Sequence, residues 1–100
     1  MVKLFYKDIL IAEQVKNGNA PGNLVALVPN LLPPDLFVKG STSVPVPLVI
    51  RWATSRCMPE QRIGIEAELK KLGLTKYDPY EIIKITKARL QGYDWYSLEI

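Results

Sequence analysis

Hydrophobic and polar residues alternate near the start of the chain, as they do in a half-buried β-strand. Two such runs flank Lys7-Asp8, which predicts a β-hairpin with a two-residue turn. If Tyr6 lies opposite Ile9, Leu4 lies opposite Ile11 in the same register. One face of the sheet then carries five apolar side chains, from Val2, Leu4, Tyr6, Ile9 and Ile11.

Turn-forming residues divide the next part of the chain. The stretch Lys16–Asn23 is rich in Gly, Asn and Pro, which predicts a loop with residues at positive φ. The short apolar run Leu24–Val28 predicts a buried strand. Prolines recur over residues 29–48, so we expect irregular or extended chain there, with a short edge strand at Leu36–Val38.

The pattern becomes helical in the second half. Leu48, Trp52 and Ser55 recur at intervals of four and three, and they predict a short helix that ends before Pro59. A second helix is expected to start near Pro59. Its apolar stripe would be formed by Ile65, Leu69 and Leu72, and its end would be marked by Gly73.

The third predicted helix has the clearest start. Asp78 suits the N-cap, Pro79 the first helical position and Glu81 the third, as in a capping box. Its apolar side would be formed by Ile82, Ile83, Thr86 and Leu90, and Gly92 would end it.

A terminal strand is predicted in the last seven residues, with Trp95 and Tyr96 on opposite faces. The element order predicts a single α+β domain over residues 1–100: an N-terminal β-hairpin in a small antiparallel sheet, about three short helices and a C-terminal strand. A chain of this length can bury one modest core, and we expect Trp52, Trp95 and Tyr96 to lie in it.

The composition excludes several classes of function but does not identify one. The chain has 13 Lys and Arg against 10 Asp and Glu, one cysteine and no histidine. The commonest general base and the commonest metal ligand are therefore missing, and we expect neither a metal nor a cofactor. No run is long and apolar enough for a membrane span, and the N-terminus does not resemble a signal peptide. We expect a cytoplasmic protein.

The sequence contains few candidates for catalytic residues. Cys57 stands beside Arg56 and could be an activated thiol, but without histidine a structural cysteine is the favoured interpretation. Glu60 and Glu66 are six apart, a spacing that does not bring two carboxylates together on one helix face. The sequence therefore favours a protein without enzymatic activity.

Two loops are candidates for contact with a partner protein. The first is apolar, and its leucines and phenylalanine would form a binding patch if they could not all fold inward. The second is polar and contains two arginines, which either fix the loop to the fold or meet the partner. The predicted contact residues are Leu31, Leu32, Leu36, Phe37, Arg56, Glu60, Gln61 and Arg62.

A nucleic-acid-binding surface is the alternative. It would use a diffuse group of basic residues in the second half of the chain: Lys70, Lys71, Lys76, Lys84, Lys87 and Arg89. Such binding also needs exposed aromatic rings for stacking or a helix that enters a groove. Since the aromatic residues are expected in the core, protein contact is the favoured hypothesis.

Most of the chain, with the exception of the middle loop, resembles the N-terminal subdomain of HipA-like kinases. That family has an N-terminal hairpin followed by an apolar, proline-punctuated segment, which Val44–Leu48 ("VPVPL") resembles. Met58-Pro59 and Arg62 stand where the family has Leu-Pro and a following arginine. Asp78-Pro79 with Ile82-Ile83 is similar to the family's start of a further helix.

The resemblance implies a regulatory or toxin–antitoxin setting. The kinase body that carries the family's catalytic residues has no room in 100 residues, so those residues map onto nothing in this chain. What the resemblance implies is a small antitoxin-like or regulatory protein that binds a HipA-type kinase. The alternative is a free-standing domain whose function has drifted, or one from a mobile element.

Overall fold

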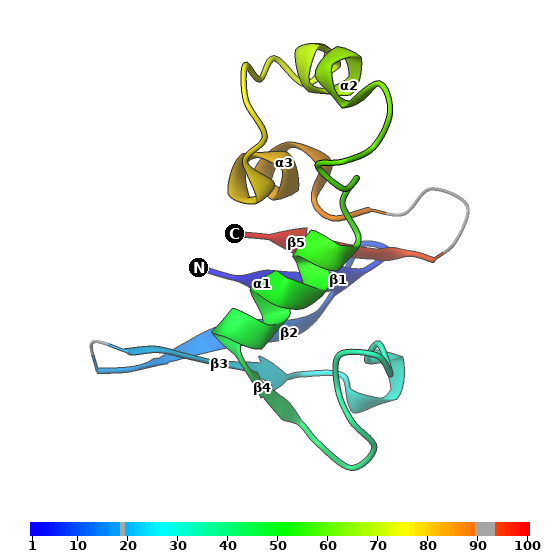
Figure 1. The fold of residues 1–100 in the computed structure, drawn as a ribbon. Helices are drawn as coiled ribbons and strands as arrows, with labels where there is room; N and C mark the ends of the chain where they lie inside the picture. Colours follow the sequence, from blue (N-terminus) through cyan, green and yellow to red (C-terminus); the bar gives the residue numbers. More distant parts are fainter. Residues whose placement is uncertain (19, 90–93) are drawn as a thin grey trace.

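The computed structural model describes residues 1–18, 20–89 and 94–100. Its centre is a five-stranded antiparallel sheet with the strand order β4-β3-β2-β1-β5. Helix α1 lies across one face of this sheet, and α3 and α2 lie beyond the β5 edge (Figure 1). The elements are β1 (Lys3–Tyr6), β2 (Ile9–Asn17), β3 (Ala20–Ala26), the 3-10 turn η1 (Pro29–Leu31), β4 (Ser43–Pro45), α1 (Val46–Ser55), α2 (Ile65–Lys71), α3 (Pro79–Thr86) and β5 (Tyr96–Glu99). The predicted α+β fold is confirmed.

The N-terminal hairpin has the predicted turn but not the predicted register. Tyr6 lies opposite Ile9, whereas Leu4 lies opposite Ala12 instead of Ile11 because β2 contains a β-bulge. A bulge sets two residues against one on the neighbouring strand, and here both Ile11 and Ala12 are fully buried. Ile9 pairs with Tyr6 as predicted, but it is half exposed, so not every apolar side chain assigned to that face is buried.

The predicted loop Lys16–Asn23 is mostly strand. β2 runs to Asn17 and β3 starts at Ala20, so the connection is much tighter than expected. Gly22 has the positive φ that was predicted for this stretch, at +75°. A Cβ atom at this position would lie 1.9 Å from the carbonyl oxygen of Val15, so only glycine fits where the two strands approach.

The edge strand of the sheet lies later in the chain than predicted. At Leu36–Val38 the chain turns, because the N–H groups of Leu36 and Phe37 both donate to the carbonyl of Pro33, at 3.1 and 3.0 Å. Those donors cannot serve a strand ladder at the same time. The edge is formed instead by Ser43–Pro45, which pairs with β3.

The helices begin and end where their capping residues allow. α2 starts at Ile65 and not near Pro59, because residues 59–62 form a turn and Gly64 precedes the helix with a φ of +82°. Its predicted end is confirmed: Gly73 has a φ of +77°, and its N–H donates to the carbonyl of Lys70.

α3 has the predicted start. The Asp78 carboxylate accepts hydrogen bonds from the backbone N–H groups of Tyr80 (3.0 Å) and Glu81 (3.5 Å). Two of the helix's first donors, which have no partner within the helix, are thereby satisfied.

The end of α3 comes earlier than predicted. The helix stops at Thr86, where Lys87 takes a left-handed conformation with a φ of 57°. The Lys87 carbonyl then accepts a hydrogen bond from the N–H of Leu98 in β5, at 2.8 Å. Leu90 and Gly92, which were expected to belong to the helix and to its end, lie outside the described residues.

The core fills the space between α1, α3 and the inner face of the sheet. Its fully buried side chains include Leu4, Ile11, Leu24, Val49, Ile83 and Leu98. The outer face of the sheet carries no helix in the described part of the chain (Figure 1). Among the described residues, no helix has the length and apolar character that crossing a membrane requires.

Candidate functional site

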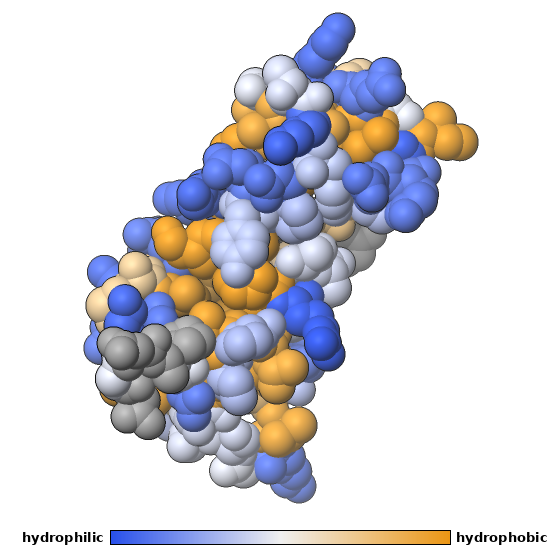
Figure 2. Space-filling view, turned by 60° about the vertical axis from the view of Figure 1, so that its left-hand side comes forward, coloured by the Kyte–Doolittle hydropathy of each residue, from blue (hydrophilic) through white to orange (hydrophobic). Residues whose placement is uncertain are grey.

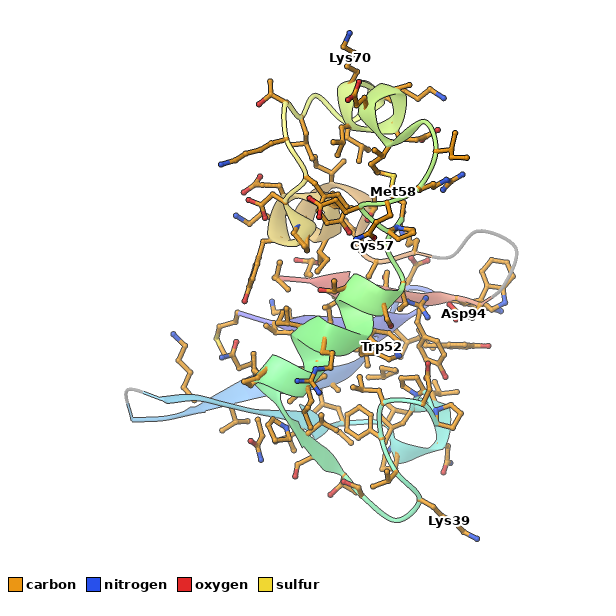
Figure 3. The ribbon with its side chains drawn as sticks, in the orientation of Figure 1. Lys39, Trp52, Cys57, Met58, Lys70 and Asp94 are labelled. Atoms are coloured by element: carbon orange, nitrogen blue, oxygen red, sulfur yellow. The ribbon has the colours of Figure 1, made fainter. Side chains whose placement is uncertain are left out.

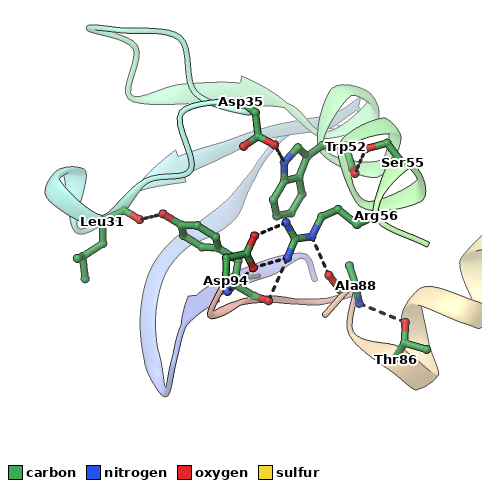
Figure 4. A network of polar contacts seen from close by, with 9 residues as sticks. Leu31, Asp35, Trp52, Ser55, Arg56, Thr86, Ala88 and Asp94 are labelled. Carbon is green, nitrogen blue, oxygen red and sulfur yellow. Dashed lines mark hydrogen bonds and ion pairs between the residues drawn. The ribbon is translucent and has the colours of Figure 1, made fainter. Parts of the chain in front are cut away.

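Arg56, at the end of α1, is the centre of a polar network of described residues. Its guanidinium donates two hydrogen bonds to the Asp94 carboxylate, at 2.9 and 2.6 Å. A further bond runs from Nε to the carbonyl of Ala88, at 2.7 Å (Figure 4). Only 6% of the Arg56 side-chain surface is exposed. A bidentate pair of this kind is a strong polar contact, and it lowers the pKa of the Asp94 carboxyl.

The same network reaches the proline-rich loop. The Arg56 guanidinium stacks on the Trp52 ring, 4.5 Å from its centroid. Trp52 Nε1 in turn donates to the Asp35 carboxylate at 3.0 Å, and the Tyr96 hydroxyl donates to the carbonyl of Leu31 at 2.8 Å. Arg56 therefore joins α1 to the chain before β5, and its side chain is almost fully enclosed by these contacts. Of the two roles left open for this arginine, fixing its loop to the fold is the one that these contacts support.

The apolar loop folds inward. Phe37 is 4% exposed, and the three leucines are partly buried against the core: Leu31, Leu32 and Leu36. The condition for a binding patch, that these side chains cannot all fold inward, is not met. The loop contributes to the packing of the sheet and of α1.

The polar loop has the opposite character. Glu60, Gln61 and Arg62 are all exposed, and Ile63 beside them is 99% exposed. Ile63 was not among the predicted contact residues, because the helix was expected to start near Pro59 and Ile63 would then lie within it. Figure 2 shows that the end of the molecule carrying α2 mixes hydrophilic side chains with smaller hydrophobic areas.

Cys57 is a partly buried thiol near the start of this loop. It lies between α1 and the helices α2 and α3 (Figure 3), and its Sγ is 3.4 Å from the carbonyl of Ala53. Burial raises the pKa of the Cys57 thiol, although Arg56 nearby acts in the lowering direction. A raised pKa is the opposite of what an activated thiolate needs.

The six predicted basic residues do not form one described cluster. Lys70 projects from α2 away from the sheet (Figure 3), and Lys71 beside it pairs with Glu68 at 3.6 Å. Lys84 on α3 pairs with Glu81 at 3.3 Å, and Lys76 follows α2 in an exposed segment. The remaining two, Lys87 and Arg89, are brought together with other residues in a pocket.

That pocket has a volume of about 160 Å³ and opens on the outer face of the sheet. Two segments and two strands line it: the β1–β2 turn, the chain after α3, β1 and β5. Its lining residues are Phe5, Lys7, Asp8, Lys87, Arg89, Ser97 and Glu99. Three cations, two carboxylates and an aromatic ring therefore meet at one depression, although only two of these residues were predicted to act in binding.

No set of His, Cys, Asp and Glu side chains in the described residues is grouped to hold a metal ion. Comparison with known proteins found no matching family model, no matching curated protein and no matching solved structure.

Proposed function

We propose that the protein is an interaction module without catalytic activity, and that it contacts its partner through the loop of residues 59–64, here termed the exposed loop. One observation supports this most directly: Ile63 is almost completely exposed, between polar neighbours. In protein interfaces, a few anchoring side chains are surrounded by near-neutral contacts that exclude water, and Ile63 with its polar neighbours has the layout of such an anchor. Burial of a side chain of this size on binding is worth about 2 kcal/mol.

The exposed loop is held in shape before any partner arrives. Within it the N–H of Arg62 donates to the carbonyl of Pro59 at 3.1 Å. At its start the Tyr77 hydroxyl donates to the carbonyl of Met58 at 2.8 Å. At its end the N–H of Ile65 donates to the carbonyl of Arg62 at 3.2 Å. Such preorganisation reduces the ordering cost of binding.

The partner proposed for this loop is a HipA-type kinase, which the chain would restrain in an antitoxin-like or regulatory manner. The similarity of the sequence to the N-terminal subdomain of those kinases is the support for this choice. Glu60 and Arg62 offer one charge of each sign beside Ile63, so that a complementary kinase surface would need the reverse pair. Such rim charges contribute to specificity and association rate more than to affinity.

A binding titration with an Ile63→Asp variant tests the proposal. A HipA-type kinase would be titrated with wild-type protein, with Ile63→Asp and with Val38→Asp as a matched control. Val38 is another exposed aliphatic residue, but it lies outside the exposed loop. We expect Ile63→Asp to weaken binding at least about tenfold and Val38→Asp to leave it unchanged. Equal loss in both variants, or no binding by the wild type, would exclude this contact.

Nucleic-acid binding is the second candidate, favoured by the convergence of Lys87 and Arg89 on the pocket with Lys7. Phosphate contacts release counterions, so binding of this kind weakens steeply with salt. Retention of mixed-sequence DNA or RNA that falls as salt rises would support it, and no retention at low salt would exclude it.

A further inference from the structure

We propose that the pocket on the outer face of the sheet, together with the neighbouring Trp95 ring, is a binding site for single-stranded nucleic acid. The site rests on the nucleic-acid alternative above and is independent of the protein contact at the exposed loop. It would bind one phosphate among its cations while bases stack on its aromatic rings.

The aromatic part of the site contradicts the expectation from sequence. Trp95 is 64% exposed and does not lie in the core. It immediately precedes β5, where its carbonyl accepts a hydrogen bond from the N–H of Lys7 at 2.9 Å. Phe5 lines the pocket itself and lies opposite Ser97 across the β1–β5 pair. An exposed aromatic ring beside cations is what stacking on an unpaired base requires.

The cations are positioned by the backbone. Lys7 has a φ of 55° in the β1–β2 turn, and its Nζ lies 5.5 Å from the centroid of the Trp95 ring. On the other side of the pocket, Lys87 has a φ of 57° and is held to β5 through the Leu98 N–H. Arg89 follows two residues later and lines the same depression. Cations from two distant segments thus surround one spot.

The small volume of the pocket, which is open to solvent, favours a strand over an enclosed free nucleotide. Pockets that enclose a small ligand usually have roughly 300–1,000 Å³, and this pocket has about 160 Å³. It has room for a phosphate or for part of a base but not for a whole nucleotide. An enclosed mononucleotide is therefore disfavoured, whereas a strand lying across the uncovered sheet could place one phosphate here and a base on Trp95.

Two carboxylates limit the affinity of the site. Asp8 and Glu99 line the pocket with the three cations, so its net charge is only weakly positive. Each carboxylate would repel a bound phosphate. Removal of one of them should strengthen binding, an effect that a folding defect cannot imitate.

Fluorescence titrations of labelled single-stranded DNA and RNA test the cations. We expect the double variant K87Q/R89Q to bind about tenfold more weakly, and the slope of log affinity against log salt to fall by about 0.7, as the loss of the one phosphate bound in the pocket predicts. The matched control is K70Q/K71Q, which removes the same charge from α2. An equal loss in both double variants would indicate a diffuse basic surface and would overturn the pocket while leaving nucleic-acid binding in place.

The stacking partner is tested by W95A against Y80A. Both residues are exposed aromatics, but Tyr80 lies on α3. We expect a loss of about tenfold for W95A and no change for Y80A. Equal affinity of W95A and wild type would overturn the stacking site.

The last variant, E99Q, should raise affinity for the oligonucleotide about twofold at low salt, because it removes a negative charge from the pocket. A decrease in affinity would contradict the site.

Mononucleotides and inorganic phosphate serve as further probes. If either binds as tightly as an oligonucleotide, a small anion and not a strand is the ligand, and the proposal is overturned. No binding of any nucleic acid by the wild type would exclude both the pocket and the nucleic-acid alternative.

Discussion

Two proline-containing loops of this protein, one mainly apolar and one mainly polar, lie very differently in the structure. The loop after β3 and the loop after α1 both contain proline, apolar residues and charge, and both were predicted to contact a partner. In the structure, Phe37 of the first loop is buried in the core, while Ile63 of the second is almost fully exposed. Apolar content alone therefore does not show which loop is available to a partner.

The difference lies in hydrogen-bond donors supplied by distant elements. Buried Trp and Tyr side chains need partners for their N–H and O–H groups. The first loop provides them, since Asp35 accepts from Trp52 and the carbonyl of Leu31 accepts from Tyr96. The exposed loop has one such anchor, just before it at Met58, where the Tyr77 hydroxyl donates at 2.8 Å. Otherwise it is shaped by backbone bonds of its own turns. Hydrogen bonds from Trp52 and Tyr96 therefore hold the first loop inward, and these bonds form only once distant parts of the chain have come together.

The largest effect on stability is expected when the inward loop loses its main side chain. Phe37→Ala should lower the free energy of unfolding by about 3 kcal/mol, because it removes a buried aromatic ring and leaves a cavity. Urea denaturation followed by tryptophan fluorescence measures the change. A loss below about 1 kcal/mol would mean that the loop can leave the core at little cost, and the contrast between the two loops would fail.

A somewhat smaller effect is expected at the ion pair that carries the network. Asp94→Asn leaves the enclosed guanidinium of Arg56 without its carboxylate and should cost about 2 kcal/mol. Arg56→Lys tests the geometry, because lysine keeps the charge but loses the bidentate contact and the stacking on Trp52. If Arg56→Lys is as stable as wild type, charge alone holds these segments together.

The same pair predicts a dependence on pH. The pKa of Asp94 is lowered in the folded protein from its ordinary value of 3.8, chiefly by the hydrogen bond from Arg56. The unfolded chain therefore takes up this proton at a higher pH than the folded one. The stabilisation is complete above that ordinary value and is lost as the pH falls through the folded pKa. In acid titrations of unfolding, the difference between wild type and Asp94→Asn should shrink only below about pH 4. A difference that stays constant under acid would contradict the assignment.

The anchor between Trp52 and the inward loop should contribute less. Asp35→Ala removes the acceptor of the indole N–H and should cost about 1 kcal/mol. Trp52→Phe removes the donor but also part of the core, so the two changes and their combination form a double-mutant cycle. A coupling energy near zero would show that the hydrogen bond does not hold the loop.

Local signals were sufficient where one short stretch determines the structure. The cap at Asp78 and the stop at Gly73 depend on neighbouring residues only, and both were predicted correctly. The β-bulge at Ile11 depends on how two strands share their hydrogen bonds, and no local pattern announces it. The Arg56–Asp94 contact joins residues 38 positions apart. The sequence therefore suggested a structural and a binding role for the arginine but could not choose between them.

The candidate sites were less predictable for the same reason. Lys87 and Arg89 were chosen for their charge, but their meeting with Lys7 and Phe5 depends on how the chain leaves α3. That direction is set by the left-handed conformation of Lys87. Because glycine is the residue that usually indicates this conformation in a sequence, it could not be predicted here. The exposure of Trp95 was missed because a tryptophan beside a predicted strand is ordinarily a core residue.

The smallest effect on stability is expected at Ile63, and this makes it the sharpest comparison with Phe37. Its side chain already lies in water, so Ile63→Asp should change the free energy of unfolding by no more than about 0.5 kcal/mol. The same substitution is expected to have the largest effect on partner binding, because a carboxylate would enter a contact that needs an apolar group. Urea denaturation of this variant beside Phe37→Ala measures the contrast directly. If Ile63→Asp destabilises the fold as much as Phe37→Ala does, Ile63 is a packing residue, and the proposal that the exposed loop contacts a partner is contradicted.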